Sequence, residues 1–523
     1  MRWALPIPIL LAACATTPAP TPKLDCSLPG PRAEGASIED AARSYVAACG
    51  LAQTSSLTST LVTFPTVRAR EGKTGPSFVA MRRYLEKWSE RHGFTFENFD
   101  DDPWVISWGE GDPSVAFVMH ADVVPVVEDV KAERPRVPSG WSTAPFEVVE
   151  RQGRLYGRGT EDDKGPIAAV LNTMVTLKSL GYQPRGKVQA ILGTGEEHDW
   201  DGMVAYAKKA PHAKFVVSID ANFPVVVAES GFVRWLLTAP RGAVGDGCAE
   251  VTEAKAGQFL TQVPGEALLK LSSAGGLDMA AQSISDRANV NTQIEGTTLT
   301  VYGRAVHSSV ADEGDNALWA LARAAAKLNL CDGGVKQLLA TVAKYFDGDH
   351  WGERLGVAYD HETMGKLLVV PTMLRVDEDT VTLSINMRRP AGRDVEAFNA
   401  MLDTALEKIR AEVSTAIHEN RERRYVGEPA LADTKGPLVN ILLDIYRKAS
   451  GDPNAKPLSI RGGTYARLFP GAVSFGPSIP GREYRGHAPD EYLESEALQL
   501  MNVTLLEALL RLDSEFGRTN PDE

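Results

Sequence analysis

Acidic residues and one histidine interrupt apolar sequence at four places in the first half of this chain: His120, Asp122, Asp162, Asp163, Glu196, Glu197 and Asp220. The densest of these places is GRGTEDDKGP, residues 157–166, which is too rich in glycine for a stable helix. A charged, glycine-rich loop on its own is more often a solvated turn. Its flanking sequence raises the question of whether these side chains form one chemical site.

Hydrolysis of an amide near neutral pH is the chemistry that such side chains suit. It needs a nucleophilic water, a base that deprotonates the water, and positive charge where the oxyanion develops. Two zinc ions about 3.5–4 Å apart can share the water and polarise the carbonyl. Their ligands are imidazole or carboxylate groups, one of which bridges the two ions. The chain offers this set of side chains.

The elements around these residues indicate how they could meet. Short apolar runs that end abruptly in polar residues are typical of buried strands, and three occur here: SVAFVMHAD, KVQAILGTGEE and KFVVSID. Helical patterns lie between and before them, in IAAVLNTMVTLKSLG and SFVAMRRYLEKWSERHG. This alternation predicts an α/β domain with a mainly parallel sheet, in which ligands bind beyond the carboxyl ends of the strands.

The pattern of predicted elements changes from about Arg234 to Arg424. Strand-like runs alternate there with long helices, as is typical of an α+β domain. Strand–helix alternation then resumes toward the C-terminal end. We therefore predict a catalytic domain in two segments, residues 38–232 and 429–523, with a lid domain inserted at 233–428. No sequence repeat indicates a solenoid.

Five motifs together resemble the co-catalytic di-zinc exopeptidase family that includes aminoacylase, carboxypeptidase G, carnosinase and succinyl-diaminopimelate desuccinylase. They are HAD (120–122), GRGTEDDKGP (157–166), GTGEE (193–197), SIDANFP (218–224) and RGHAPDEYL (485–493). Each motif alone is weak, but their order and spacing match the family from about residue 55 onward. The resemblance implies a zinc-exopeptidase fold.

The resemblance also implies the metal ligands. His120, Asp162 and Asp220 would hold one Zn²⁺, and Asp162, Glu197 and His487 the other, with Co²⁺ or Mn²⁺ as alternative ions. Asp162 would then be the bridge that the glycine-rich turn presents, braced by Asp163. Asp122 would fix the ring of His120 by accepting its second N–H. Glu196 would be the general base that deprotonates the zinc-bridging water and later protonates the leaving amine.

Residues of the predicted lid resemble the parts of the family that touch substrate. His307 in YGRAVHSS resembles a histidine that reaches the developing oxyanion. Arg388 in INMRRP resembles an arginine that grips a substrate carboxylate through its planar guanidinium. Arg389 is the neighbouring rival, and would point to the opposite face of a strand.

Within the family, the monomeric dipeptidase V group is the most similar, on the motifs above, GGTYAR (462–467) and the size of the insertion. A large lid could supply His307 in cis, which predicts a monomer. Gly463 and Thr464 would help Arg388 to hold the substrate carboxylate. Gln282 stands where that group has an asparagine that reaches the substrate, so the identity of this end of the pocket is open.

Net charge and the N-terminal sequence bear on partners and location. A net charge of −13 argues against nucleic acid or an anionic membrane surface as a partner. Residues 1–13 resemble a bacterial lipoprotein signal peptide that is cut before Cys14, and a Pro/Thr-rich tether over 14–37 follows. We therefore expect a protein on the periplasmic side of the cell envelope, attached to the membrane by a lipid on Cys14.

Four cysteines remain after Cys14: Cys26, Cys49, Cys248 and Cys331. Export permits disulfides, and three pairings are open. Pairing Cys26 with Cys49 and Cys248 with Cys331 would keep each bond local, but four free thiols are nearly as well supported by the sequence.

The sequence as a whole predicts a metal-dependent dipeptidase that acts on short peptides with a free C-terminal carboxylate. One alternative is an amidohydrolase of N-acyl amino acids, because the same ligands serve both reactions. A second is an anchored binding protein without activity, against which the presence of Glu196 speaks. The side-chain preference of the substrate pocket is not readable from the sequence.

Overall fold

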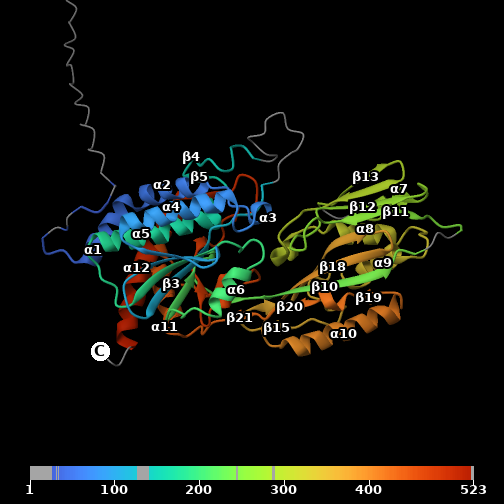
Figure 1. The fold of residues 1–523 in the computed structure, drawn as a ribbon. Helices are drawn as coiled ribbons and strands as arrows, with labels where there is room; N and C mark the ends of the chain where they lie inside the picture. The colour runs from blue at the N-terminus through green and yellow to red at the C-terminus, as the bar shows by residue number, and fades with distance from the viewer. Residues whose placement is uncertain are drawn as a thin grey trace, which may run out of the picture.

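Two lobes make up the protein (Figure 1). The computed structural model describes residues 26, 28–30, 32, 34–126, 141–242, 246–285 and 289–519. The first lobe contains the described residues up to Glu229 and those from Ala430 onward, so the blue and red ends of the chain lie together in it. The second lobe lies between, from Gly231 to Val426.

The first lobe is built on a nine-stranded mixed sheet. In spatial order its strands are β1 (Thr95–Asn98), β2 (Trp104–Trp108), β6 (Lys187–Gly193), β3 (Pro113–His120), β7 (Phe215–Ser218), β23 (Val473–Ser474), β9 (Val226–Glu229) and β21 (Ala430–Leu431), with β22 (Leu458–Ile460) beside β9. Strands β6, β3, β7 and β23 run parallel, and β2 and β9 flank them antiparallel. The parallel block carries the strands that the sequence predicted.

Helices cover both faces of this sheet. One face packs against α1 (Ile38–Tyr45), α2 (Leu51–Val62), α4 (Pro76–His92), α5 (Gly165–Ser179), α11 (Pro437–Ser450) and α12 (Ser495–Thr519), and the other against α6 (Asp201–Ala207) and the 3₁₀ turn η5 (Tyr465–Leu468). Strand β3 shows why both faces are filled: Val115, Phe117 and Met119 enter one core, whereas Ala116 and Val118 enter the other. Period-two alternation of apolar residues on both sides is what a doubly covered strand requires.

The second lobe holds an antiparallel nine-stranded sheet. Its order is β13 (Asn291–Glu295), β14 (Thr298–Tyr302), β12 (Glu266–Leu271), β11 (Val251–Ala256), β17 (Leu368–Val376), β18 (Thr380–Arg389), β10 (Gly231–Pro240) and β19 (His418–Glu419), with β20 (Tyr425–Val426) also on β10. Its helices are α7 (Leu277–Gln282), α8 (Ala317–Ala325), α9 (Gly334–Tyr345) and α10 (Val395–Glu412). The fold class is thus as predicted, an α/β domain with an inserted α+β domain.

Smaller elements complete the structure. They include α3 (Arg68–Glu71), the three-stranded sheet β4 (Val149–Arg151), β5 (Arg154–Tyr156) and β25 (Tyr492–Glu494), and the strand pairs β8 (Ala221–Asn222) with β24 (Pro477–Ser478) and β15 (Asp360–His361) with β16 (Gly365–Lys366). Pairing of β5 with β25 brings the glycine-rich turn beside the C-terminal loop. That junction matters for the site.

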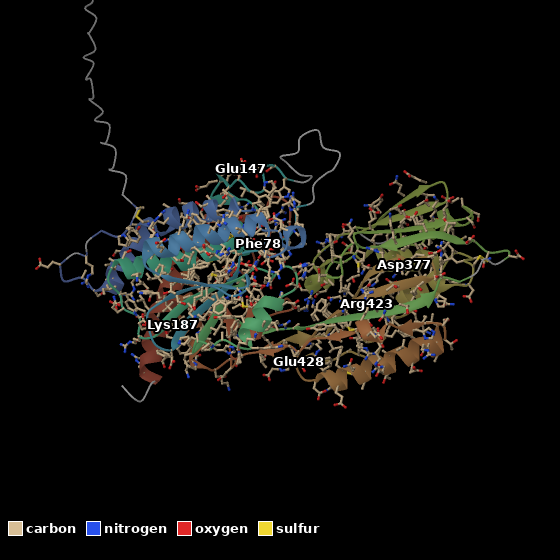
Figure 2. The ribbon with its side chains drawn as sticks, viewed as in Figure 1. Phe78, Glu147, Lys187, Asp377, Arg423 and Glu428 are labelled. Carbon is tan, nitrogen blue, oxygen red and sulfur yellow. A yellow bond between two sulfur atoms is a disulfide. The ribbon has the colours of Figure 1, made fainter. Side chains whose placement is uncertain are left out.

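The chain passes between the lobes at two places. Strand β10 follows β9 after the single residue Ser230 and runs into the second lobe (Figure 1). The return lies between β20 and β21, near Glu428 (Figure 2). In the same view Phe78 is buried inside the first lobe, whereas Asp377 occupies the turn between β17 and β18 at the outer part of the second.

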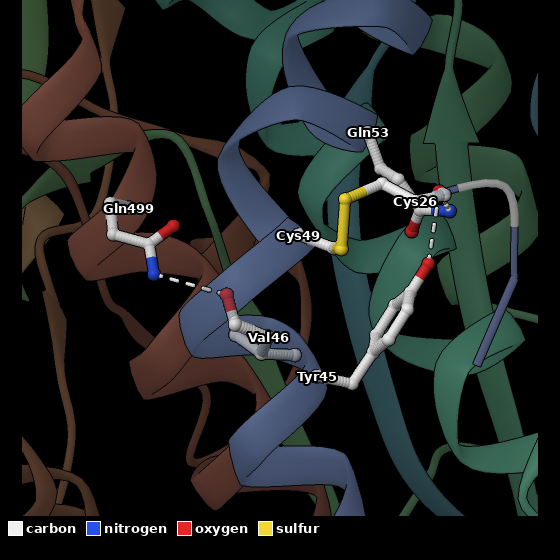
Figure 3. The surroundings of a disulfide bond; sticks show 6 residues. All are labelled: Cys26, Tyr45, Val46, Cys49, Gln53 and Gln499. Atoms are coloured by element: carbon white, nitrogen blue, oxygen red, sulfur yellow. Dashed lines mark hydrogen bonds between the residues drawn. A yellow bond between two sulfur atoms is a disulfide. The ribbon is translucent and has the colours of Figure 1, made fainter. Parts of the chain in front are cut away.

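Both disulfides join cysteines that follow one another along the chain, 23 and 83 residues apart. Cys26 pairs with Cys49 and Cys248 with Cys331, so the local pairing, left open by the sequence, is the one formed. Figure 3 shows the first bond, where Tyr45 and Gln53 also donate hydrogen bonds to the backbone oxygen of Cys26. The bond therefore fixes the chain just before α1 onto the first lobe.

Replacing Cys248 and Cys331 together by serine is expected to lower the stability of the second lobe by about 2–5 kcal/mol, because the bond closes a long loop of the unfolded chain. Thermal unfolding followed by circular dichroism checks this. Reductant should shift the wild-type transition by more than that of the variant, which keeps only the Cys26–Cys49 bond. An unaltered melting transition in the variant would show that the bond does not stabilise the lobe.

The predicted signal peptide (1–13) and Cys14 lie outside the described residues, as does most of the tether. Within the part of the chain that the structure describes, no helix has both the length and the apolar character needed to cross a membrane.

Candidate active site

Three neighbouring parallel strands deliver several of the predicted residues to one edge of the first sheet. His120 is the last residue of β3, whereas Asp220 follows β7 by two positions and Glu196 follows β6 by three. The order β6–β3–β7 places the three strand ends side by side. Because parallel strands end at the same edge, the loops after them meet there. The sequence prediction on this point is confirmed by the topology.

The glycine-rich stretch becomes a tight turn that presents Asp162. The turn spans Thr160–Lys164 and begins after Gly159, whose φ of 88° lies in the left-handed region that favours glycine. Gly165 is also required: a Cβ there would lie 2.3 Å from the backbone oxygen of Thr160. The peptide bond between Asp162 and Asp163 is cis. The glycines of the motif thus serve the geometry of the turn.

A buried carboxylate from the far end of the chain organises this turn. Oε1 of Glu491 accepts hydrogen bonds from the backbone N–H groups of Gly159, Glu161 and Asp162, at 3.0, 3.0 and 3.2 Å. Its other oxygen accepts from Arg158 at 2.5 Å. Glu491 is fully buried, so the arginine supplies the charge that offsets its burial.

The two oxygens of Asp162 face two different histidines. Oδ1 lies 2.7 Å from Nε2 of His120, and Oδ2 lies 3.1 Å from Nε2 of His487. Oδ2 also accepts a hydrogen bond from Tyr484 at 2.6 Å. A carboxylate that bridges two cations needs its oxygens turned to two separate ligand sets, and Asp162 has this arrangement.

The remaining predicted ligands lie in the same cluster. Glu197 Oε1 is 2.6 Å from Nε2 of His487, and Asp220 Oδ2 is 3.8 Å from Nε2 of His120. Ligand atoms lie within 4.8 Å of one another in two groups: His120, Asp162 and Glu197, and His120, Asp163 and Asp220. The structure therefore brings the five predicted ligands together, and adds Asp163 as a neighbour.

Asp163 differs from Asp162 in its partners. Its Oδ2 accepts the backbone N–H of His120 at 3.1 Å, which fixes the strand end against the turn. Its Oδ1 is buried and has no hydrogen-bond partner among the described residues. Burial, followed by the charge of Asp220, holds the pKa of Asp163 well above its ordinary value. An orphaned buried carboxylate oxygen of this kind is what a cation nearby would satisfy.

The crowding of carboxylates gives a second test of whether cations fit. Burial, then the charge of Asp220, raises the pKa of Glu196 well above its ordinary value. Burial raises the pKa of Asp220 itself to about 7, with Asp162 and Glu197 adding to the effect and His120 opposing it. Buried carboxylates at such distances repel one another unless positive charge is shared between them. The donor set of imidazole and carboxylate groups suits divalent cations such as Zn²⁺.

Asp122 holds both His120 and the turn that carries Glu196 and Glu197. Nδ1 of His120 lies 2.9 Å from the backbone oxygen of Asp122 and 3.5 Å from its carboxylate. Donation from Nδ1 leaves Nε2 free to bind a metal. The carboxylate of Asp122 instead accepts the backbone N–H groups of Glu196 and Glu197, at 3.1 and 3.0 Å. Asp122 therefore does more than contact the ring of His120 as predicted. Its carboxylate also fixes the backbone of Glu196 and Glu197, which the sequence did not indicate.

His307 and Arg388 come from the second lobe. His307 precedes the 3₁₀ turn η3 (Ser308–Glu313), and its Nδ1 accepts the backbone N–H of Ser309 at 3.3 Å. The ring proton is therefore assigned to Nε2. The side chain of His307 is exposed at its surface. Desolvation by the surrounding protein, followed by the positive charges of Arg388 and His487, nevertheless lowers the pKa of His307 to about 3. A neutral imidazole with an Nε2–H donor suits a developing oxyanion.

Arg388 is buried without an acidic partner. Its guanidinium donates to Ser308 Oγ at 2.8 Å and to Asn386 Oδ1 at 3.1 Å, and lies over the ring of Phe232. No carboxylate among the described residues forms an ion pair with it. Burial, then the nearby Arg467, lowers its pKa to about 9, so the charge remains at neutral pH. Such a cation is poised to receive a carboxylate from a ligand.

Arg389 points the other way, as strand periodicity requires. Its guanidinium donates to the backbone oxygens of Gly427 and Arg393 and pairs with Glu428. These contacts fasten the second lobe to the returning chain. Of the two adjacent arginines, Arg388 is the one free to bind a carboxylate.

Three predicted substrate contacts are placed differently from the others. Thr464 donates hydrogen bonds from its hydroxyl and its backbone N–H to the carboxylate of Glu229, at 2.6 and 2.9 Å. Gly463 lies beside the guanidinium of Arg467, which a Cβ there would approach to 3.0 Å. Gln282 ends α7 with an exposed side chain, on the part of the second lobe where α7 packs on α8 and β13 (Figure 1). The described contacts do not join Gln282 to the cluster, and the three substrate roles stay predictions.

Several residues of the site were not found from the sequence. Glu161 accepts hydrogen bonds from Ser478 Oγ and from the backbone N–H of Arg485, so it fastens the loop that carries His487. Burial raises the pKa of Glu161 to about 8. Glu491 lies in the motif RGHAPDEYL and Tyr484 directly precedes it. Their positions in the sequence do not indicate that both contact the turn of Asp162. Their role depends on the pairing of β5 with β25.

Comparison with known proteins agrees with this geometry. Residues 116–511 match the model of peptidase family M20/M25/M40. A putative dipeptidase, YtjP, of Bacillus subtilis is 30% identical over 434 residues, which cover 81% of this chain and 88% of the relative. The Beta-Ala-Xaa dipeptidase of Lactobacillus delbrueckii subsp. lactis is 28% identical over 443 residues, covering 83% and 89%.

Solved structures are similar in fold. Human carnosine dipeptidase 1 superposes with a TM-score of 0.53 at 14% identity, covering 91% of this chain and 99% of that one. The dipeptidase Dug1p of Saccharomyces cerevisiae gives 0.53 at 13% identity, covering 91% and 98%. These likenesses show the fold alone.

Proposed function

This chain belongs to peptidase family M20/M25/M40, and from that premise we propose that it is a metal-dependent dipeptidase. Its substrates are short peptides with a free C-terminal carboxylate. The observation that carries the proposal is the convergence of five ligand side chains, with the oxygens of Asp162 turned to His120 and His487. The names of the two sequence relatives support the same reading.

The proposed ligand sets follow the oxygens of Asp162. His120 and Asp220 would complete one set, and Glu197 and His487 the other, for Zn²⁺ or for Co²⁺ or Mn²⁺ in its place. Two such cations held by these residues would polarise the scissile carbonyl and lower the pKa of a water. The residues around them perform the rest of the reaction.

Glu196 moves the proton. Its backbone is fixed by Asp122, which places the carboxylate beside the cluster. Glu196 takes a proton from the attacking water and delivers it to the nitrogen of the leaving amine. Its raised pKa suits a group that must both accept and return a proton.

His307 and Arg388 act on the substrate from the second lobe. His307 donates its Nε2–H to the carbonyl oxygen as negative charge develops there. Arg388 binds the C-terminal carboxylate and so limits the distance from that end to the scissile bond. Because His307 and the ligands belong to one chain, and the charge of His487 acts on His307, we propose a monomeric enzyme.

Arg388→Met is expected to raise KM for a dipeptide by about 10- to 100-fold, since a hydrogen bond to a charged group contributes about 1.5–3 kcal/mol. Steady-state kinetics on a dipeptide and on its C-terminal amide check this. The amide lacks the carboxylate, so its kcat/KM should hardly change. An equal loss on both substrates would show that Arg388 does not bind the carboxylate.

A substrate panel tests the function itself. The metal-loaded enzyme should hydrolyse dipeptides, with zinc, manganese or cobalt added back after chelation. Turnover of N-acyl amino acids without turnover of dipeptides would favour the amidohydrolase alternative. The alternative of an inactive binding protein has no support in the residues of the site, where Glu196 and the ligands are all in place.

We also propose that the protein works in the bacterial cell envelope, on the periplasmic side. Its two disulfides support an oxidising compartment. The lipid anchor on Cys14 remains part of this proposal, and mass spectrometry of the N-terminal peptide from membranes would test it.

A further inference from the structure

The turn that carries His307 is held by an arginine of the other lobe. Arg461 follows β22 of the first lobe, whereas η3 belongs to the second. Nη1 of Arg461 lies 2.9 Å from Oδ1 of Asp312 and donates to the backbone oxygen of Ser309 at 3.4 Å. The same guanidinium lies over the ring of Trp351, 5.4 Å from its centroid. One side chain thus contacts the second lobe at three points.

These contacts lead directly to the imidazole of His307. Ser309, whose backbone oxygen Arg461 holds, has its Oγ 2.6 Å from Nδ1 of His307 and its N–H directed at the same atom. Position and tautomer of the ring therefore depend on where Ser309 lies. Arg388 holds the preceding residue, Ser308, but from within the second lobe. Of these contacts around Ser308 and Ser309, only the hydrogen bond from Arg461 to Ser309 connects the chain beside His307 to the first lobe.

Solvent exposure shows that this is more than a fully solvated ion pair. The side chains of Arg461 and Asp312 are 27% and 30% exposed. A partly buried pair that also uses a backbone carbonyl and an aromatic ring has a defined geometry, which a solvated pair lacks. Its position between two lobes makes it suited to fix their relative placement.

We propose that Arg461 is a positioning residue for His307, and that it acts from the first lobe by holding η3 at the metal cluster. This inference rests on the proposed peptidase function. Arg461 does not touch the reacting atoms in this arrangement. Its effect is to keep the Nε2–H of His307 within reach of the developing oxyanion, where a displacement of about 1 Å costs on the order of 100-fold in rate.

A double-mutant cycle tests the inference. Arg461→Met should lower kcat by about 10- to 100-fold, with KM and metal content nearly unchanged. His307→Ala should lower kcat by about 10²–10³-fold. If Arg461 acts through His307, adding Arg461→Met to His307→Ala should lower kcat by less than about threefold more. Fully multiplicative losses would overturn the proposal, because they would show that Arg461 acts on its own.

Arg304 supplies a matched control. It also pairs with an aspartate beside η3, Asp315, at 3.3 Å, and contacts the backbone oxygen of Glu313, but all of these lie within the second lobe. Arg304→Met should leave kcat unchanged. An effect as large as that of Arg461→Met would show that any loosening of η3 is sufficient, and would contradict a link between the lobes.

A readout other than activity separates this inference from the proposed function. Amide hydrogen exchange over residues 306–313 of the metal-loaded protein should speed up in Arg461→Met and remain as in wild type in Arg304→Met. The exchanged pair Arg461→Asp with Asp312→Arg should restore slow exchange only in part, because it re-forms the ion pair but not the hydrogen bond to the backbone oxygen of Ser309. If the wild type hydrolyses no dipeptide, the proposed function fails while the exchange measurement still tests the link. Unchanged exchange in Arg461→Met would overturn the link itself.

Discussion

Replacing Glu196 by glutamine should lower kcat for dipeptide hydrolysis by about 10²–10⁴-fold while both metal ions stay bound. The loss is that of general acid–base catalysis, because glutamine has the shape of glutamate but neither accepts nor returns a proton. Metal is retained because Glu196 is not in either proposed ligand set. Its backbone hydrogen bond to Asp122 is also unaffected by the change.

Kinetics and metal analysis on the same preparation check this result. Glu110→Gln, at an exposed position after β2, is the control for the loss of one carboxylate and should behave as wild type. Loss of a metal ion from the Glu196 variant would make this residue a ligand. A rate that is unchanged would place the base elsewhere.

Replacing Asp162 by asparagine should have the larger effect, because it removes one oxygen donor and the negative charge from between the two proposed ion positions. We expect fewer than two ions per chain and a loss of rate greater than that of the Glu196 variant. Calorimetric titration with Zn²⁺ and elemental analysis measure the binding without reference to activity.

Asp163→Asn is the matched control for this experiment. The two aspartates are adjacent and buried, and geometry alone admits either as a ligand. Asp163 already spends one oxygen on the backbone of His120, so its variant should keep two ions with weakened affinity. Retention of two ions by the Asp162 variant together with loss in the Asp163 variant would reverse the assignment of the bridge.

Part of this site was predictable from the rule that ligands bind beyond the carboxyl ends of parallel strands. Parallel strands that end in polar residues bring those residues to one edge, and His120, Glu196 and Asp220 follow that rule. The resemblance favoured Arg388 over Arg389, whereas the strand period predicts only that the two side chains point to opposite faces. The structure adds that Arg389 is the one already paired, with Glu428. The resemblance to a family supplied the proposed roles, and the fold brings the five proposed ligands together.

What escaped prediction depends on contacts between distant parts of the chain. Glu491 organises the turn of Asp162 across 329 positions of sequence, and no local pattern signals such a contact. Gln282 was placed by alignment to a motif, whereas α7 packs against its own lobe. The link from Arg461 to η3 is equally invisible, because it exists only once two separately folded lobes meet.

The dependence of the turn on Glu491 has a consequence for synthesis in the cell. His487 and Glu491 are translated after His120 through Asp220, so a nascent chain that has not yet reached them lacks the support of its central turn. We therefore expect the cluster around Asp162 to take its final geometry only after the segment that carries Glu491 has folded onto the turn.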